Sequence, residues 1–443
     1  MALWREALGE LAVDELCAEL IRFDTTNLGD GESLLGERAI AEYVAEHLTD
    51  FGLAPTLLER SHSRSNVVVR VPGADPSLPP LLVHAHLDVV PADASEWTVP
   101  PFAGEIRDGY VWGRGAVDMK DMSATLLTTL SRWSAAGTVP RRDIVLAFVA
   151  DEEDRGEWGA HWLVEEHRSL FADCAAAIGE SGGYTVHATH AGGSPVRLYP
   201  VATAERGTAH LRLTAAGRAG HGSRRNDDNA VTTLVHALSR LAAHRWPVRL
   251  TPAVRGFLAE AGPALGIEVD LTDMDVTLRR LGPAAKIIEN TVRNSTTPTV
   301  LTAGYKVNVI PGTASALVDT RVLPGTEEEV LAEIDRLLGP GVRREFVHQQ
   351  TAVQAPVVSP WFDAMAGSLR TFDPEAVVVP FCMGGGTDAK AFVRLGIDCF
   401  GFAPLYLPEG FDHRLMAHGV DERVPVEGLR FGVNVLDRFL STC

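Results

Sequence analysis

Short runs of apolar, largely β-branched residues recur along this chain and constrain its fold more than any other feature. They lie at 66–71 (NVVVRV), 81–86 (LLVHAH), 144–149 (IVLAFV) and 175–179 (AAAIG). Runs of this length and composition predict strands that are buried on both faces. Helical stripes lie between them, for example Leu126, Leu127, Leu130 and Trp133. Strands that alternate with helices predict an α/β sheet covered by helices on both faces.

The pattern changes near residue 203. TAHLRLTAAG (208–217) and ASALVDTRV (314–322) alternate between apolar and polar residues, and a helical stripe lies between them. Such strands predict a small α+β domain whose sheet has one solvated face. Buried-strand patterns return after about residue 355, in AVVVPF and IDCFGF. We therefore predict a discontinuous catalytic domain with a mostly parallel sheet, residues 1–202 and 355–443, interrupted by an inserted α+β domain, residues 203–354. Within the insert, 244–306 carries no readable motif.

Composition excludes several classes of protein. A chain of 443 residues with 46% hydrophobic and 22% charged residues is globular and long enough for two or three domains. Its formal net charge of −18 argues against a nucleic-acid partner. The five cysteines are scattered and form no CxxC pair, which predicts a reducing, cytoplasmic location. The N-terminal segment lacks the apolar core of a signal peptide, and no stretch is long and apolar enough to predict a membrane span.

Acidic and imidazole side chains lie at the ends of the predicted strands. In LLVHAHLDVVP, His86 ends an apolar strand and Asp88 follows two residues later. Strand side chains alternate with period two, so both lie on one face. A carboxylate in this position can bind the far ring nitrogen of a metal-bound histidine and orient its ring. His84 shares this face but lies deeper, so we expect a buried histidine with a hydrogen-bond partner.

Two further segments place carboxylates beside sheet or helix ends. Asp118 precedes a helix in GYVWGRGAVDMKD, where a helix N-cap is the simpler interpretation. Its position downstream of His86 and Asp88 favours a metal ligand instead. Glu152 and Glu153 directly follow the run IVLAFV. Adjacent acids usually mark a solvated turn, but this strand directs them to the carboxyl edge of the sheet, where α/β proteins bind ligands.

The last two segments complete a set suited to a hydrolytic metal. Glu180 follows AAAIG and precedes glycines, and His418 lies in the loop LMAHGVDERVP before the last helix. Histidine and carboxylate ligands suit zinc, with manganese or cobalt as substitutes. Of the adjacent Glu152 and Glu153, one can bind metal while the other accepts a proton from metal-bound water. The order of these segments on successive strand ends predicts a hydrolytic metal centre.

These motifs as a set resemble a known family. HLDVVP, GRGAVDMKD, ADEED, IGES and HGVDERVP are similar, in order and spacing, to the metallopeptidases that include glutamate carboxypeptidase, aminoacylase, acetylornithine deacetylase, succinyl-diaminopimelate desuccinylase and carnosinase. The resemblance extends through AERGTAHLRLTAAGRAGHGS, NVIPGTASALVDTR and GGGTDAKAF, and departs at Ala85, where the family often has glycine. It implies zinc-dependent hydrolysis of a peptide or N-acyl amide bond in a small substrate with a free carboxylate, as in carboxypeptidases and dipeptidases.

The resemblance implies a centre with two zinc ions. Asp118 would bridge them. His86 and Glu180 would complete the protein ligands of one ion, and Glu153 and His418 those of the other.

The resemblance also implies roles around the metals. Glu152 would be the general base, and Asp88 would orient His86. The inserted domain would be a lid and the interface of a homodimer, from which His221 of the partner subunit would stabilise the developing oxyanion. Contacts with the substrate's backbone and carboxylate would come from the lid and a glycine loop: Asn308, Arg321, Gly385 and Gly386.

Other interpretations stay open at this point. A biosynthetic N-acyl-amino-acid deacylase would carry the same centre, because the lid residues that select the substrate form no readable motif. A catalytically silent relative would be expected to have lost Glu152 or one of the predicted ligands. Glu152 and all of those ligands are present in this sequence. No GxSxG motif and no recognisable cysteine nucleophile supports a nucleophile-based hydrolase. His413, close to His418, we expect on the surface.

Overall fold

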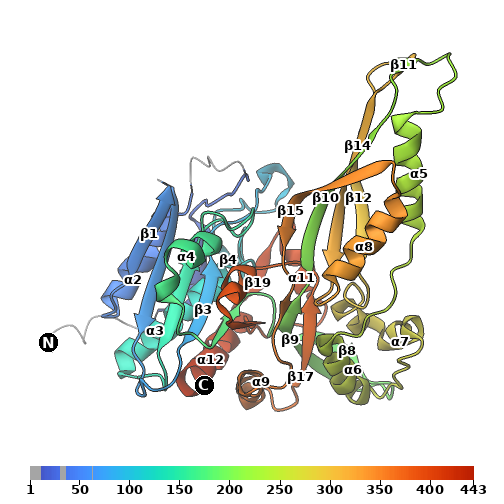
Figure 1. Ribbon diagram of the computed structural model, residues 1–443. Coiled ribbons are helices and arrows are strands. Elements are labelled where there is room, and N and C mark those ends of the chain that lie inside the picture. Colours follow the sequence, from blue (N-terminus) through green and yellow to red (C-terminus); the bar gives the residue numbers. More distant parts are fainter. Residues whose placement is uncertain (1–10, 30–35, 62) are drawn as a thin grey trace.

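The larger of two main sheets contains ten strands. The computed structural model describes residues 11–29, 36–61 and 63–443 (Figure 1). In spatial order the main path of this sheet is β1 (Thr56–Ser61), β2 (Arg64–Val71), β6 (Ile144–Val149), β3 (Leu81–His86), β7 (Ala176–Gly179), β18 (Asp398–Gly401), β9 (Pro195–Glu205) and β16 (Val353–Gln354). Two further strands pair with β9, namely β8 (Val186–Thr189) and β17 (Val377–Met383).

The centre of this sheet is parallel. β3 pairs in parallel with β6 and β7, and β18 pairs in parallel with β7. Antiparallel pairs occur toward the β1 edge, between β1 and β2 and between β2 and β6. The predicted α/β class with a mostly parallel central sheet is confirmed. Because parallel strands end at the same edge, the residues that follow β3, β6 and β7 come together there.

Helices cover both faces of the larger sheet. One face carries α1 (Val13–Ile21), α2 (Arg38–Asp50), α3 (Lys120–Ala136), α9 (Pro360–Phe372) and α12 (Val426–Thr442). The other carries α4 (Ala160–Glu166) and α10 (Ala389–Phe392). Along β2, Val67 and Val69 pack into the first core and Val68 into the second. Both faces are buried, and this explains why the strand sequences are apolar throughout rather than alternating.

The smaller sheet has four strands and one covered face. Its order is β12 (Ser295–Ala303), β14 (Thr313–Val322), β10 (Gly207–Ala216) and β15 (Val342–Gln350). Helices α5 (Ala230–Ala243) and α8 (Glu327–Leu338) cover one face, and buried residues alternate along β14 as the sequence predicts. Asn229 caps α5 by accepting hydrogen bonds from two backbone N–H groups of its first turn. Within the described ranges, no helix combines the length and apolarity needed to cross a bilayer.

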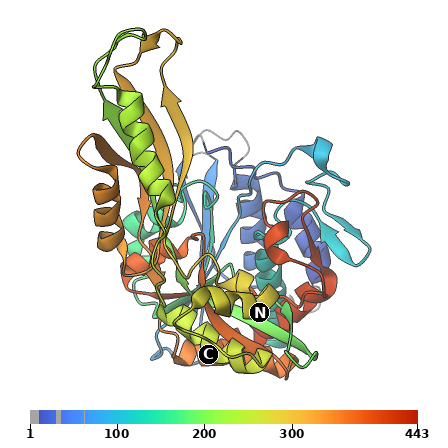
Figure 2. The ribbon, with the colours of Figure 1, turned by 90° about the vertical axis from the view of Figure 1, so that its right-hand side faces the viewer.

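The chain passes between the two sheets at two points. It leaves the larger sheet between Glu205 and Gly207 and returns between Gln350 and Val353. The division into 1–202, 203–354 and 355–443 stays a prediction. One part of the range 203–354 packs elsewhere: α6 (Pro252–Leu265), α7 (Met274–Leu281) and the 3-10 helix η3 (Gly282–Ile287) form a core with β9 and β17 of the larger sheet. Figure 2 shows this segment at the base of the molecule, below the smaller sheet.

Candidate metal centre

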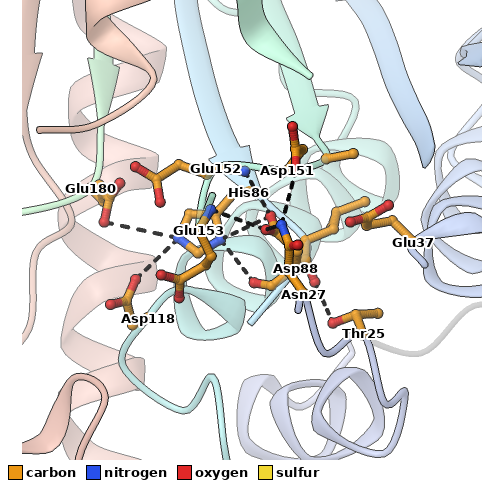
Figure 3. A network of polar contacts seen from close by, with 12 residues as sticks. Thr25, Asn27, Glu37, His86, Asp88, Asp118, Asp151, Glu152, Glu153 and Glu180 are labelled. Atoms are coloured by element: carbon orange, nitrogen blue, oxygen red, sulfur yellow. Dashed lines mark hydrogen bonds and ion pairs between the residues drawn. The ribbon is translucent and has the colours of Figure 1, made fainter. Parts of the chain in front are cut away.

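Strand ends bring the first group of candidate ligands together. His86 is the last residue of β3, Glu180 follows β7, and Asp118 lies in the loop before α3 (Figure 3). The Nε2 atom of His86 lies 3.0 Å from an Asp118 oxygen and 4.0 Å from a Glu180 oxygen. The three residues offer ligand atoms that all lie within 4.8 Å of one another.

A second group shares Asp118 with the first. His418, in the loop between α11 (His413–Met416) and β19 (Arg423–Pro425), approaches two carboxylates with its Nε2 atom. That atom lies 3.2 Å from the other oxygen of Asp118 and 3.0 Å from Glu153. These ligand atoms also lie within 4.8 Å of one another. The geometry therefore offers two adjacent cation positions with one carboxylate between them.

Asp118 is not the N-cap of helix α3. The N-cap is Met119, which makes no side-chain capping bond. The loop that carries Asp118 is instead fixed by Glu422, four residues beyond His418. Glu422 accepts hydrogen bonds from Arg114 (2.7 Å) and from the backbone N–H groups of Gly115 (3.0 Å) and Val117 (2.8 Å). The loops of Asp118 and His418 are thus held together by one buried carboxylate.

Asp88 fixes both His86 and the turn that follows β6. His86 Nδ1 lies 2.9 Å from the backbone carbonyl of Asp88 and 3.6 Å from its carboxylate. That carboxylate accepts backbone hydrogen bonds of 3.1 Å from both Glu152 and Glu153. It also accepts a 2.9 Å bond from Asn27 (Figure 3). Asp88 therefore positions the two glutamates as well as the histidine.

Asn27 joins this arrangement to the N-terminal part of the chain. Its amide also donates to Asp151 at 3.0 Å, and its oxygen accepts a 3.0 Å bond from Arg64. Arg64 in turn forms a fully buried ion pair with Glu37. Nothing in the sequence around Asn27 marks it as part of the site. Sequence reasoning missed it for that reason.

The buried carboxylates at this edge form a set suited to cations. Glu180 and Glu152 are buried beside other carboxylates. Desolvation, together with the charge of Asp118 for Glu180 and of Glu180 for Glu152, raises the pKa of both well above the ordinary value. Burial also raises the pKa of Asp388 to about 8. An oxygen of Glu153 is buried and has no hydrogen-bond partner within residues 11–29, 36–61 and 63–443. Unpaired buried carboxylates are costly, so a set of acidic and imidazole donors like this fits divalent metal ions.

The comparison with known proteins agrees with this geometry. The profile of peptidase family M20/M25/M40 matches residues 82–442. The chain belongs to this family. The predicted resemblance is confirmed, and with it the prediction of a hydrolase.

Individual members of the M20 family resemble the chain over most of its length. N-fatty-acyl-amino acid synthase/hydrolase PM20D1 of Homo sapiens is 29% identical over 406 residues, 86% of this chain and 79% of that protein. Aminoacylase-1 of Sus scrofa is 28% identical over 91% of this chain and 89% of that protein. The M20 family metallo-carboxypeptidase Sso-CP2 from Sulfolobus solfataricus shares the fold, with a TM-score of 0.67 and 18% identity over 97% of this chain and 98% of that structure.

A cavity lies between the solvated face of the smaller sheet and the candidate metal ligands. The cavity measures about 390 Å³ and is lined by Asp118, Glu152 and His418 on one side and by Arg321 of β14 on the other. Asp319 accepts hydrogen bonds of 2.7 and 3.2 Å from the Arg321 guanidinium, and Thr208 accepts one of 3.2 Å. The structure therefore places Arg321 in the same cavity as the candidate metal ligands, and its contact with a substrate carboxylate stays a prediction.

The glycine loop follows β17 beside the same cavity. Glu205 anchors it by accepting hydrogen bonds from the Thr387 hydroxyl (2.6 Å) and backbone N–H (3.1 Å). Arg206 donates to the Gly384 carbonyl at 3.0 Å. Gly386 lines the cavity that Arg321 lines, and Gly385 lines a second cavity on the other side of the loop. Glu205 and Arg206 belong to a motif quoted for the resemblance, but their anchoring role depends on a contact more than 170 residues away.

Two predicted site residues lie far from the centre of their own chain. His221 in β11 (Gly220–His221) pairs with β13 (Val309–Ile310), and the Asn308 carbonyl accepts a 2.9 Å bond from Gly222. Both residues are exposed, and Figure 1 shows β11 at the outer tip of the smaller sheet, away from β3. Neither lines the cavity at the metal centre.

Two histidines differ from expectation. His84 is buried as predicted, but its Nε2 atom has no hydrogen-bond partner among the described residues, because the ring packs against Gly179 and Phe392. His413 is half-buried rather than fully exposed at the surface as expected. Its ring stacks on Tyr184 with centroids 4.3 Å apart, and burial lowers its pKa to about 4. The helix α11 turns this side chain inward, which the motif alone does not reveal.

Proposed function

We propose that this chain is a two-zinc hydrolase that cleaves the amide bond of a small substrate with a free carboxylate. The observation that carries the proposal is the pair of ligand groups that share Asp118. His86 and Glu180 would hold one ion, and Glu153 and His418 the other. When bound, the ions would supply Lewis-acid polarisation of the scissile carbonyl and a lowered pKa for the attacking water.

Glu152 is the residue best suited to proton transfer. It belongs to neither ligand group, yet it lines the cavity beside them. Its backbone N–H is held by Asp88, so its side chain is kept near the metal ligands. Glu152 would accept a proton from the attacking water and return it to the leaving amine. Asp88 would orient His86 through the short contact of its carbonyl with Nδ1 and would hold the Glu152 turn through its carboxylate.

Arg321 and the glycine loop would receive the free carboxylate. Asp319 binds the Nε and one Nη donor of this guanidinium and fixes its orientation, which leaves one N–H on each Nη atom for the substrate carboxylate. Gly385 and Gly386 would add backbone N–H donors. Substrates would therefore lie with their carboxylate toward the smaller sheet and their scissile bond at Asp118.

A homodimer would supply the remaining groups. His221 and Asn308 are too distant from the centre of their own chain to act there without a large movement, so we assign them to the site of a partner subunit. The open edge of β12 supports this arrangement. It exposes Val300 and Leu301, and the following loop exposes Tyr305 and Val307. Exposed apolar residues on an edge strand are typical of an association surface.

The relatives favour a second candidate within the same chemistry, an N-acyl-amino-acid deacylase. Two proteins that resemble this chain over most of its length bear the names N-fatty-acyl-amino acid synthase/hydrolase and aminoacylase. The same centre and the same carboxylate contact would serve this reaction. For location we retain the cytoplasm, since all five cysteines are free and buried.

One experiment tests the centre and the chemistry together. The purified protein is analysed for metals and assayed on dipeptides and N-acyl amino acids, before and after EDTA and with zinc, manganese or cobalt restored. We expect up to about two metal equivalents and loss of activity with EDTA. Glu152→Gln should lose several orders of magnitude in kcat and keep its metal, whereas Glu153→Gln should lose metal. Full activity without metal, or equal metal loss in both variants, would contradict the proposal.

A further inference from the structure

A second cavity is lined by some of the same candidate ligands as the cavity that Arg321 lines. It measures about 470 Å³, within the range of small-molecule sites. Like the cavity that Arg321 lines, it is bounded by Asp118, Glu180 and His418. One substrate molecule can therefore occupy both cavities, with its scissile bond at Asp118. If the carboxylate lies on the Arg321 side, the acyl side of the amide lies in the second cavity.

Apolar and polar side chains share the walls of this cavity. The apolar ones include Val117, Met119, Ile287, Phe381, Met383 and Ala403. Apart from the candidate ligands, the polar ones include Asp121, Ser181, Asn290 and Thr291. The stacked rings of Tyr184 and His413 form a further part of the wall.

The two positively charged side chains that line this cavity already interact with other groups of the protein. Lys286 lies 3.6 Å from Asp412, and Arg414 lies 3.2 Å from the same carboxylate. Arg414 also donates a 2.7 Å hydrogen bond to the Lys286 carbonyl. A charged acyl group would have to displace these contacts, whereas an apolar chain would leave them intact.

The segment without a readable motif builds one wall. Helix α6 packs Val254 and Phe257 against Leu198 of β9 and Val379 of β17. This packing carries the chain through α7 and η3 to the metal edge, where η3 and the residues after it line the cavity with Lys286, Ile287, Asn290 and Thr291. The segment is thus attached to the catalytic sheet rather than to the smaller sheet, so it stays beside the ligands.

We propose that this cavity binds the apolar acyl chain of an N-acyl amino acid, and that Ile287 is a specificity-determining residue for the length of that chain. The inference rests on the proposed function, since it assumes hydrolysis at this centre. It adds the side on which the acyl group lies, the chemical class of that group and the segment that selects it.

The test compares acyl chains on one amino acid. The kcat/KM of the metal-loaded enzyme is measured for the N-acetyl, N-butanoyl, N-hexanoyl and N-octanoyl derivatives of phenylalanine. Each methylene group that becomes buried should raise the wild-type kcat/KM by about threefold to fourfold until the cavity is full. In Ile287→Asp, the ratio of octanoyl to acetyl kcat/KM should fall by at least about tenfold, because a carboxylate opposes the burial of apolar surface.

A matched control shows whether the effect of Ile287→Asp depends on its position in the cavity wall. Leu271 lies in the same segment, between α6 and α7, is half-exposed and does not line the cavity. Leu271→Asp should keep the wild-type ratio. Ala403 also lines the cavity, so Ala403→Leu should reduce its volume and shift the preferred acyl chain to a shorter one. This variant provides the test if Ile287→Asp does not fold.

The outcomes separate the two proposals. If no dipeptide or N-acyl amino acid is hydrolysed with any metal, the proposed function is wrong and the inference fails with it. If N-acetyl-phenylalanine is hydrolysed but kcat/KM does not rise with chain length, the inference alone is wrong. An unchanged octanoyl-to-acetyl ratio in Ile287→Asp and an unchanged preferred chain in Ala403→Leu would also overturn it.

Discussion

Replacing Glu422 by glutamine should destabilise the protein and weaken its metal centre together. Glu422 is fully buried, and its two oxygens accept hydrogen bonds from Arg114, Gly115 and Val117. A glutamine has only one acceptor atom. In its best orientation, the amide oxygen keeps Arg114 and Gly115 and the amide nitrogen faces the Val117 N–H, which loses its acceptor.

The size of the effect follows from these contacts. An unsatisfied buried N–H costs about 1–3 kcal/mol. Removing the charge that faces the buried Arg114 guanidinium adds to this, since loss of one partner of a buried ion pair costs about 3–5 kcal/mol. The amide still accepts from Arg114, so we expect a total of about 3–5 kcal/mol in the free energy of unfolding. In a domain larger than about 250 residues, 1 kcal/mol shifts Tm by somewhat less than about 2 °C, so the expected fall in Tm is roughly 5–8 °C.

The assay is thermal unfolding at about pH 8, where the carboxylate is charged although burial raises its pKa to about 7. Glu427→Gln is the matched control. It makes the same change five residues away, in an ion pair whose side chains are 78% and 55% exposed, and should shift Tm by less than about 2 °C. Glu422 joins the Asp118 and His418 loops, so metal affinity should also fall by about 10- to 100-fold. Equal Tm values and equal metal affinities for the two variants would refute this reasoning.

Three further predictions test other parts of the molecule. Amidating the free carboxylate of a substrate should lower kcat/KM by about 10- to 100-fold, through loss of a charge-assisted contact with Arg321; equal rates for acid and amide would exclude that contact. Mixing inactive His221→Ala with inactive Glu152→Ala should restore partial activity in hybrid dimers, and background activity after proven subunit exchange would rule out a role of His221 in the partner's site. Arg197 lowers the pKa of Asp373 by donating two hydrogen bonds of 2.6 Å. The Tm difference between wild type and Asp373→Asn should therefore be full above the ordinary carboxyl pKa of about 3.9 and shrink as the pH falls through the lowered pKa. A difference that stays constant down to pH values below that range would show that the ion pair is not its source.

The strands and the residues at their ends could be predicted from the sequence, because a short run of apolar residues is enough to identify a buried strand. A run such as IVLAFV identifies a buried strand from its own residues, and Glu152 is then placed at the end of that strand. Parallel strands bring their ends to one edge, so His86, Glu152 and Glu180 could be grouped without knowledge of the full topology. The ambiguity of Asp118 was of a different kind. A residue before a helix looks the same whether it caps the helix or faces a neighbouring loop.

The contacts that hold the centre in place could not be predicted in this way. Glu422 and Arg114 lie 308 positions apart, and Asn27 and Asp88 lie 61 apart. No periodicity links such pairs, since a hydrogen bond across the fold depends on where whole elements pack. His413 shows the same limit, because the orientation of a short helix decides whether its ring reaches solvent or Tyr184.

The sequence by itself determined the α/β class, the candidate residues at the strand ends and the family, because hydrophobic period and motifs can be read along the chain without its fold. Only the tertiary structure decided where the segment 252–291 belongs. Its helices carry ordinary apolar stripes that would fit either sheet, and the packing of Phe257 against Leu198 and Val379 selects the catalytic one. That choice places Ile287 in the same cavity as the candidate metal ligands. Side-chain packing between distant elements, not local pattern, positions a wall of a cavity.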